Sequence, residues 1–294
     1  MFRSFLRFTL VLATAFLLLA TAAHAETHTT NLYWAPQNAT VGGEKIDVIL
    51  NSIFVLTTVV FILTQAFLIY YLVKYRRREG VKAQYSHGNN KLEVVWTLLP
   101  TIIFIALVIW SNRTWHELLQ SPIPPDALEV QVVAYQFGWD FLYPGADGKL
   151  GASDVRLITP DNKFGQDKSD PAGKDDFTSA EFVIPVNKVV HILLRSRDVI
   201  HSFYVPQFRL YQDAIPGRTI SWVRFQTIRT GNFELACSQL CGAGHYNMKA
   251  KIRVVSQEEY DKWFAGKAQA HAAAAAASAT ESKDQNLVQA SEHK

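Results

Sequence analysis

Two long uncharged runs near the beginning of the chain restrict its fold more than any other feature. Residues 48–73 carry no charged side chain, and residues 94–113 include only Arg113, at their end. A helix of about 20 apolar residues spans the hydrocarbon core of a bilayer. Because lipid offers no hydrogen-bond partner to an unpaired backbone, such runs cross it as helices. We therefore predict a membrane protein in which residues 26–120 form a hairpin of two transmembrane helices, at about 48–73 and 94–113.

Basic residues set the orientation of this hairpin. A cluster follows the first run directly and the short connecting loop adds more: Lys74, Arg76, Arg77, Arg78, Lys82 and Lys91. By the positive-inside rule this loop stays in the cytoplasm. The chain is then a multi-pass protein of the bacterial plasma (inner) membrane, in contact with the lipid bilayer. Its N-terminus and everything after Trp115 are expected in the periplasm or exterior.

Residues 1–25 have the pattern of a secretory signal peptide. Arg3 and Arg7 form a basic start, residues 10–20 form an apolar stretch, and residues 23–25 read Ala-His-Ala, a typical cleavage site. The apolar stretch is shorter than a membrane span. A third membrane helix is the alternative interpretation.

The rest of the chain is expected to form a β-rich domain over residues 126–265. A stiff linker, Ser-Pro-Ile-Pro-Pro at 121–125, precedes it. Runs rich in β-branched and aromatic residues predict strands at 128–141, 181–186, 189–195, 202–205, 219–226, 231–237 and 250–255. Regularly spaced short strands are typical of a sandwich or barrel. The polar residues 159–178 are predicted to form a surface loop.

The C-terminal part changes in composition. Ser256 and Glu259 form a capping box that opens a short helix through Phe264. Residues 268–294 are alanine-rich and then polar, and we predict a solvated or disordered low-complexity tail. The chain contains no C-x-x-C-H haem attachment motif, and its net charge of +3 gives no case for nucleic-acid binding.

The soft metal-binding side chains gather in one short segment. Residues 237–248 read Cys-Ser-Gln-Leu-Cys-Gly-Ala-Gly-His-Tyr-Asn-Met and hold both cysteines and the only methionine besides Met1. Thiolate, imidazole and thioether ligands together favour copper. Two thiolates can bridge two copper ions, which leaves one imidazole for each ion. A second histidine is then required, and His201 lies upstream between predicted strands.

Other interpretations of Cys237 and Cys241 fit less well. A structural disulfide suits two isolated cysteines in the oxidising periplasm, but it leaves the nearby histidines and Met248 unexplained. Zinc is a poor match because methionine is an unusual zinc ligand. A mononuclear blue copper site needs only one cysteine.

The spacing C-x3-C-x3-H-x2-M, with a histidine upstream, resembles the copper A (CuA) motif of subunit II of bacterial haem–copper cytochrome c oxidases. Trp-Thr-Leu-Leu-Pro at 96–100 and Asp-Ala-Ile-Pro-Gly-Arg at 213–218 also match this family. The resemblance runs from the first membrane helix to about Phe264. It implies an α+β membrane protein whose N-terminal two-helix hairpin carries a C-terminal cupredoxin-like Greek-key β-barrel.

The resemblance also implies a binuclear copper A centre, bound by the backbone carbonyl of Gln239 and by five side chains: His201, Cys237, Cys241, His245 and Met248. Such a subunit accepts electrons from cytochrome c or another periplasmic donor. It passes them to haem in subunit I, where oxygen reduction is coupled to proton pumping. Haem is then expected only in the partner subunit, and subunits I and III are the expected partners.

Two positions depart from the family pattern. Many members have a glutamate in place of Gln239, and its carboxylate binds a magnesium ion shared with subunit I. A neutral amide is a weaker ligand for a hard cation, so a magnesium site is not firmly implied here. Relatives usually have a tryptophan in place of Phe137, where electrons from cytochrome c arrive. Phe137 and Trp139 are therefore the candidate electron-input residues, although core packing also explains Trp139.

Further charged residues match the family more loosely. Glu93, just before the second span, matches a glutamate at the cytoplasmic mouth of a proton pathway into subunit I, and a carboxylate at a membrane boundary is suited to collecting protons. Residues that match the border with the subunit I haem propionates are Arg195, Arg197, Asp198 and Asp213. Ordinary surface charge is the alternative for all of them.

Three other functions share parts of this pattern. A quinol-oxidase-type subunit II lacks copper, which the intact ligand set argues against. The electron-input subunit of a nitric or nitrous oxide reductase also holds copper A, whereas the hairpin with Glu93 favours an oxygen reductase. A free-standing copper-delivery protein is the third.

Overall fold

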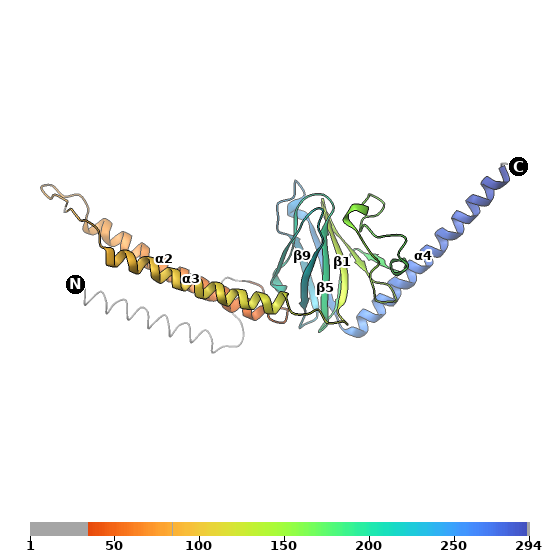
Figure 1. Cartoon of the computed structure of the whole chain (residues 1–294), viewed down its shortest axis with the longest axis horizontal. Helices are drawn as coiled ribbons and strands as arrows, with labels where there is room; N and C mark the ends of the chain where they lie inside the picture. Colours follow the sequence, from red (N-terminus) through yellow and green to blue (C-terminus); the bar gives the residue numbers. More distant parts are fainter. Residues whose placement is uncertain (1–34, 84, 293–294) are drawn as a thin grey trace.

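The computed structural model describes residues 35–83 and 85–292, so the predicted signal peptide at 1–25 lies outside the described residues. Two long helices form the predicted hairpin, α2 (Gly43–Lys74) and α3 (Asn90–Leu119), and each extends beyond its predicted span at both ends. Both are long and apolar enough to cross a membrane. Figure 1 shows the hairpin pointing away from the β domain, with the connecting loop at its far end.

The β domain is a sandwich of two five-stranded sheets. In spatial order the first sheet contains β3 (Phe177–Ser179), β2 (Gly138–Tyr143), β1 (Leu128–Tyr135), β5 (Val189–Ser196) and β8 (Ile220–Gln226). The second contains β4 (Phe182–Pro185), β10 (Lys249–Val255), β9 (Gly231–Cys237), β6 (His201–Val205) and β7 (Leu210–Ala214). The pairs β1–β5 and β4–β10 are parallel. The predicted fold class is confirmed: two apolar helices followed by a cupredoxin-like β domain.

Inward-facing side chains of both sheets form an apolar core rich in aromatic residues. Phe141 of β2 stacks on Phe182 of β4 with ring centroids 5.0 Å apart, and Phe203 of β6 meets Phe182 edge-on. Leu235 and Cys237 alternate into the same core along β9. Because interiors of this kind are close-packed, the strand end that carries Cys237 is held in a fixed position.

Several strand predictions were wrong in detail. Residues 128–141 form two antiparallel strands, because the chain turns between Tyr135 and Gly138. β3 begins at the end of the predicted loop 159–178 and continues one residue beyond it, and β7 lies where no strand was predicted. Both missed strands are at sheet edges, where a strand needs no continuous apolar pattern.

The predicted C-terminal helix is present but continues much further, as α4 (Gln257–Glu292). The hydroxyl of Ser256 accepts a hydrogen bond from the Glu259 amide at 3.2 Å, as the capping box predicts. Trp263 and Phe264 anchor the first turns against Tyr143 and Phe177. The predicted end at Phe264 was wrong, since alanine has the highest helix propensity and extends the helix. The tail is helical rather than disordered, and its described side chains are mostly exposed, as expected for a solvated segment.

The hairpin is attached to the β domain, called the barrel below, through backbone hydrogen bonds and a buried ion pair. The amide of Val41 donates to the carbonyl of Gln226 at 2.9 Å. In α2, Asp47 accepts two hydrogen bonds from the guanidinium of Arg209, at 2.6 and 3.0 Å, and both side chains are almost fully buried. Separating a buried pair leaves a charge uncompensated, so this contact fixes the start of α2 on the barrel.

Candidate metal centre

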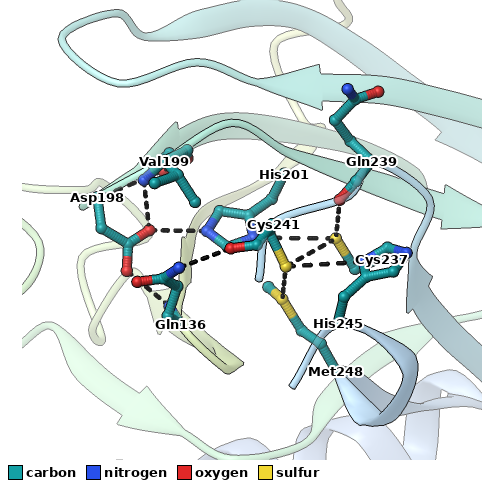
Figure 2. A network of polar contacts seen from close by, with 10 residues as sticks. Gln136, Asp198, Val199, His201, Cys237, Gln239, Cys241, His245 and Met248 are labelled. Carbon is teal, nitrogen blue, oxygen red and sulfur yellow. Dashed lines mark hydrogen bonds and ion pairs between the residues drawn. The ribbon is translucent and has the colours of Figure 1, made fainter. Parts of the chain in front are cut away.

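The predicted ligands come from two neighbouring strands and the loop that follows one of them. His201 begins β6 and Cys237 ends β9, and the two strands are paired through Phe203 and Cys237. The loop between β9 and β10, residues 238–248, then returns Cys241, His245 and Met248 to the same end of the sheet. We call this segment the metal loop. Figure 2 shows the three sulfur atoms turned toward one another, between the two histidine rings.

The two thiols are close, but not bonded. Their sulfur atoms lie 3.9 Å apart, whereas a disulfide requires about 2.05 Å. A metal–thiolate bond is about 2.3 Å long, so one ion could contact both sulfurs at this separation. His201, Cys237 and Cys241 are all buried, and their ligand atoms lie within 4.8 Å of one another.

Each thiol has further donors beside it. Cys237 Sγ lies 3.8 Å from His201 Nδ1 and 3.2 Å from the carbonyl oxygen of Gln239. Cys241 Sγ lies 3.6 Å from His245 Nδ1 and 3.8 Å from the thioether of Met248. The sulfur-rich set suits a soft or borderline metal and offers no hard oxygen cage. All six predicted donors are therefore brought together.

Asp198 orients the buried histidine. Its carboxylate lies 2.7 Å from His201 Nε2, so the opposite nitrogen, Nδ1, faces the sulfur of Cys237. Burial alone would raise the pKa of Asp198, but hydrogen bonds from His201 and from the amides of Gln136 and Val199 outweigh it and lower that pKa. The charged carboxylate favours a proton on Nε2 and leaves Nδ1 free to bind a metal.

The turn between β1 and β2 closes over the loop. Gln136 donates from its side-chain amide to the carbonyl of Cys241 at 2.6 Å and from its backbone to Asp198 at 2.6 Å. The ring of Phe137 rests on Gly244, where a Cβ atom would come within 2.5 Å of it. Sequence reasoning missed Gln136 as a support of the site, because its partners are remote in the sequence.

The thiol of Cys241 is difficult to deprotonate in the metal-free site. Burial and the neighbouring Cys237 raise the pKa of the Cys241 thiol to about 11. A thiol must lose its proton to bind a metal. Metal binding therefore releases protons here, and its apparent affinity rises with pH.

The predicted electron-input residues differ in exposure. Phe137 is 44% exposed beside the metal loop, whereas Trp139 is buried. The ring of Trp139 packs edge-on against Phe203 at 5.7 Å and lies 6.4 Å from the ring of His201. Of these two residues, Phe137 is therefore the one that a docking partner can reach.

The predicted interface residues do not form one group. Arg195 is buried, and its guanidinium donates to the Thr219 hydroxyl and to the carbonyls of Ser153 and Phe164. Arg197 is partly exposed and stacks on the ring of Tyr135, with its carbon 4.5 Å from the ring centroid. The structure therefore gives Arg195 a role inside the domain and leaves Arg197 nearer the surface.

The other two predicted acids lie on separate elements. Asp213 lies on β7, paired with Ser202 on β6, one residue beyond His201. Glu93 lies in the first turn of α3 and is exposed. That turn is at the end of the hairpin remote from the β domain, so Glu93 is far from the metal cluster (Figure 1).

Two family profiles match this chain. Residues 28–113 match "Cytochrome C oxidase subunit II, transmembrane domain", and residues 128–255 match "Cytochrome C oxidase subunit II, periplasmic domain". An alternative cytochrome c oxidase subunit 2 from Bradyrhizobium diazoefficiens is 39% identical over 240 residues, which cover 80% of this chain and 84% of the relative. The chain belongs to the cytochrome c oxidase subunit II family.

A second subunit II protein agrees with this placement. The cytochrome c oxidase subunit 2 of Cereibacter sphaeroides is 32% identical over 268 residues, covering 84% of this chain and 86% of that one. The crystal structure of the periplasmic domain of subunit II of cytochrome oxidase from Bradyrhizobium japonicum is 32% identical. It covers 51% of this chain and 99% of its own, with a TM-score of 0.38. The family supports subunit II of a cytochrome c oxidase over the other functions weighed from the sequence.

Proposed function

We propose that this subunit II holds a binuclear copper A centre, through which it accepts electrons from cytochrome c or another periplasmic donor and passes them to haem in subunit I. The observation that carries the proposal is the pair of buried thiols, 3.9 Å apart and unbonded. The proposed side-chain ligands are His201, Cys237, Cys241, His245 and Met248, with the carbonyl of Gln239. When bound, copper supplies a site that gains and loses single electrons.

The protein's own contribution is to hold these donors with little movement. Asp198 fixes the ring of His201, and Gln136 fixes the loop at Cys241. Met248 and His201 are almost inaccessible to solvent, so water is excluded from that side of the cluster. A stiff, dry site needs little rearrangement when its charge changes, and a small rearrangement favours fast electron transfer.

We further propose Phe137 as the point of electron input, because it is exposed and lies directly on the metal loop. Trp139 would support it from the core, beside His201. The border with subunit I is proposed to include Arg197, Asp198 and Asp213. Arg195 would act from inside the domain, by holding the segment that contains Phe164.

The proposal includes the location of the subunit in the assembly. The hairpin would cross the inner membrane beside subunits I and III, with the β domain in the periplasm. Glu93 would then lie at the cytoplasmic side, at the mouth of a proton pathway that serves oxygen reduction and proton pumping in subunit I. Magnesium is not part of the proposal, because Gln239 offers only a neutral amide to a hard cation.

Stopped-flow spectroscopy of the purified oxidase tests the direction of electron flow. Reduced cytochrome c is mixed with the oxidised complex while the copper and haem absorption bands are followed separately. The copper band should change first and the haem band should follow it. Haem reduction that precedes or bypasses the copper band would contradict the proposal.

A further inference from the structure

A cleft of about 550 Å³ lies where the hairpin meets the barrel, and none of its lining residues belongs to the metal loop. The first turns of α2, the end of α3 and the barrel strands β7 and β8 enclose it. Its walls are largely apolar and include Ile46, Leu50, Leu118 and Phe208. A cleft of this size and lining is suited to an apolar ligand or to the apolar part of a larger one.

The cleft lies where the expected membrane span meets the β domain. Leu50 belongs to the uncharged run that begins at residue 48, so one wall is formed by the start of that span. The opposite wall is the water-soluble barrel. Trp115 and Tyr211, which are both about half exposed, also line the cleft, and these residue types are enriched where hydrocarbon meets the headgroups.

Two arginines line this cleft and differ in their partners. Arg209 is neutralised by Asp47. Arg224 donates from Nε to the carbonyl of Leu118 at 3.0 Å, but within the described residues no carboxylate forms an ion pair with it. Its cross-strand neighbour His191 already holds Glu129 at 2.7 Å, so that carboxylate is engaged elsewhere.

Arg224 is also partly desolvated. Its side chain is half-buried between the barrel and the end of α3, and this burial lowers the pKa of its guanidinium. A cation that has lost part of its hydration without gaining an anion is destabilised. Glu117, the carboxylate in the lining, is already paired with Lys45. The apolar walls and the unmatched cation of Arg224 together define a site for an anionic amphiphile.

We propose that the cleft binds one anionic phospholipid of the periplasmic leaflet. An acyl chain would lie between Leu50 and Leu118, and the phosphate would accept hydrogen bonds from the terminal nitrogens of Arg224. A guanidinium forms paired hydrogen bonds with phosphate oxygens. Because the lipid would contact both the hairpin and the barrel, it would also stabilise the angle between them.

Native mass spectrometry of the whole oxidase complex, stripped of lipid with detergent, tests this site. The complex is titrated with dioleoyl phosphatidylglycerol or dioleoyl phosphatidylcholine, and bound lipids are counted in the parent and in three variants. Arg224→Gln should weaken the binding of one phosphatidylglycerol by about fivefold, the effect expected for one basic residue near a membrane surface. Arg224→Lys, which keeps the charge, should retain most of it.

The control is Arg156→Gln, which removes an exposed arginine that already has a carboxylate partner. This variant should bind lipid as the parent does, and the copper absorption band should be unchanged in all the variants. Equal phosphatidylglycerol binding by Arg224→Gln and the parent would overturn the proposal. Loss of a neighbouring subunit from Arg224→Gln, with its lipid count unchanged, would also overturn it and assign Arg224 to an acidic group of that subunit.

Discussion

The metal loop and the membrane hairpin of this subunit differ in what stabilises them. Around the loop, the chain supplies its own supports: Asp198 holds His201, and Gln136 holds Cys241. Along the hairpin, large apolar side chains such as Leu72 and Phe104 remain more than 60% exposed. The loop is therefore organised before any partner arrives, whereas the hairpin depends on lipid and neighbouring subunits to cover it.

Replacing one of the two thiols should reduce copper binding more than any other change proposed here. Cys237→Ser removes a soft ligand from a strand end that the core holds in place. Copper affinity should fall by more than the 10–100-fold that is typical for loss of a supporting residue, with the secondary structure retained. Copper content and the visible spectrum measure the loss. Tyr246→Phe, at a loop residue that is 83% exposed, is the control and should bind copper normally.

Removing a residue that orients a ligand, rather than the ligand itself, should reduce copper affinity by a smaller factor. Asp198→Asn keeps the shape of the side chain but no longer fixes the proton on His201 Nε2. Copper affinity should fall by roughly 10–100-fold, as for other supports of metal-bound histidines. A competitive chelator titration measures it, with the exposed acid variant Asp126→Asn as the matched control. Equal affinities in the two variants would show that Asp198 does not support the site.

A smaller effect is expected where the loop meets the β1–β2 turn. Gly244→Ala would put a Cβ atom 2.5 Å from the ring of Phe137, and overpacking of this kind costs about 1–3 kcal/mol. Urea unfolding of the periplasmic domain should show this loss. Adding Phe137→Ala should restore part of the stability. Gly266→Ala, where nothing lies within 4 Å, should have no such cost.

A second histidine–carboxylate pair, His191 with Glu129, lies away from the metal loop and allows an effect on stability to be distinguished from an effect on copper binding. His191 Nδ1 lies 2.7 Å from Glu129, as His201 lies from Asp198, but its other nitrogen faces the carbonyl of Ser221. The hydrogen bond with Glu129 raises the pKa of His191 above 6.5. The stability it gives is complete below pH 6.5 and is lost as pH rises through the folded-state pKa.

The variant His191→Gln should therefore lose stability at low pH and little at high pH. Urea midpoints at about pH 5.5 and about pH 9 measure the difference. Copper content should be unchanged, because the two ring nitrogens of His191 contact Glu129 and Ser221 rather than the metal loop. A pH-independent loss of stability would contradict a role for the charged histidine.

A substitution in the hairpin should change the turnover of the oxidase complex without changing the copper site. Glu93 lies at the end of the hairpin remote from the β domain. Glu93→Ala should slow oxygen reduction by the whole complex and leave the copper spectrum unchanged, because the substitution alters only the proposed proton pathway. Oxygen uptake and the visible spectrum are measured on the same sample. Unchanged turnover would reduce Glu93 to a solvated boundary residue.

The sequence predicted the hairpin and the donors between Cys237 and Met248 because both depend on local patterns: run length for the helices and ligand spacing for the loop. His201 lies 36 residues before Cys237 and was added because a second histidine was required. It did not predict the supports of the site. Gln136 binds groups that are 62 and 105 residues away, and no local pattern marks such a contact. The sequence also did not show that Arg195 is buried, because the carbonyls that its guanidinium binds lie 31 and 42 residues away along the chain.

The number of copper ions bound by the periplasmic domain tests the central claim most directly. The domain is loaded with copper, freed of excess metal, and examined by metal analysis and electron paramagnetic resonance. The paired thiols of Cys237 and Cys241 predict two copper ions per domain that share one unpaired electron in the oxidised state, in a purple protein. One copper ion per domain, with the hyperfine pattern of a single copper nucleus, would contradict a binuclear centre.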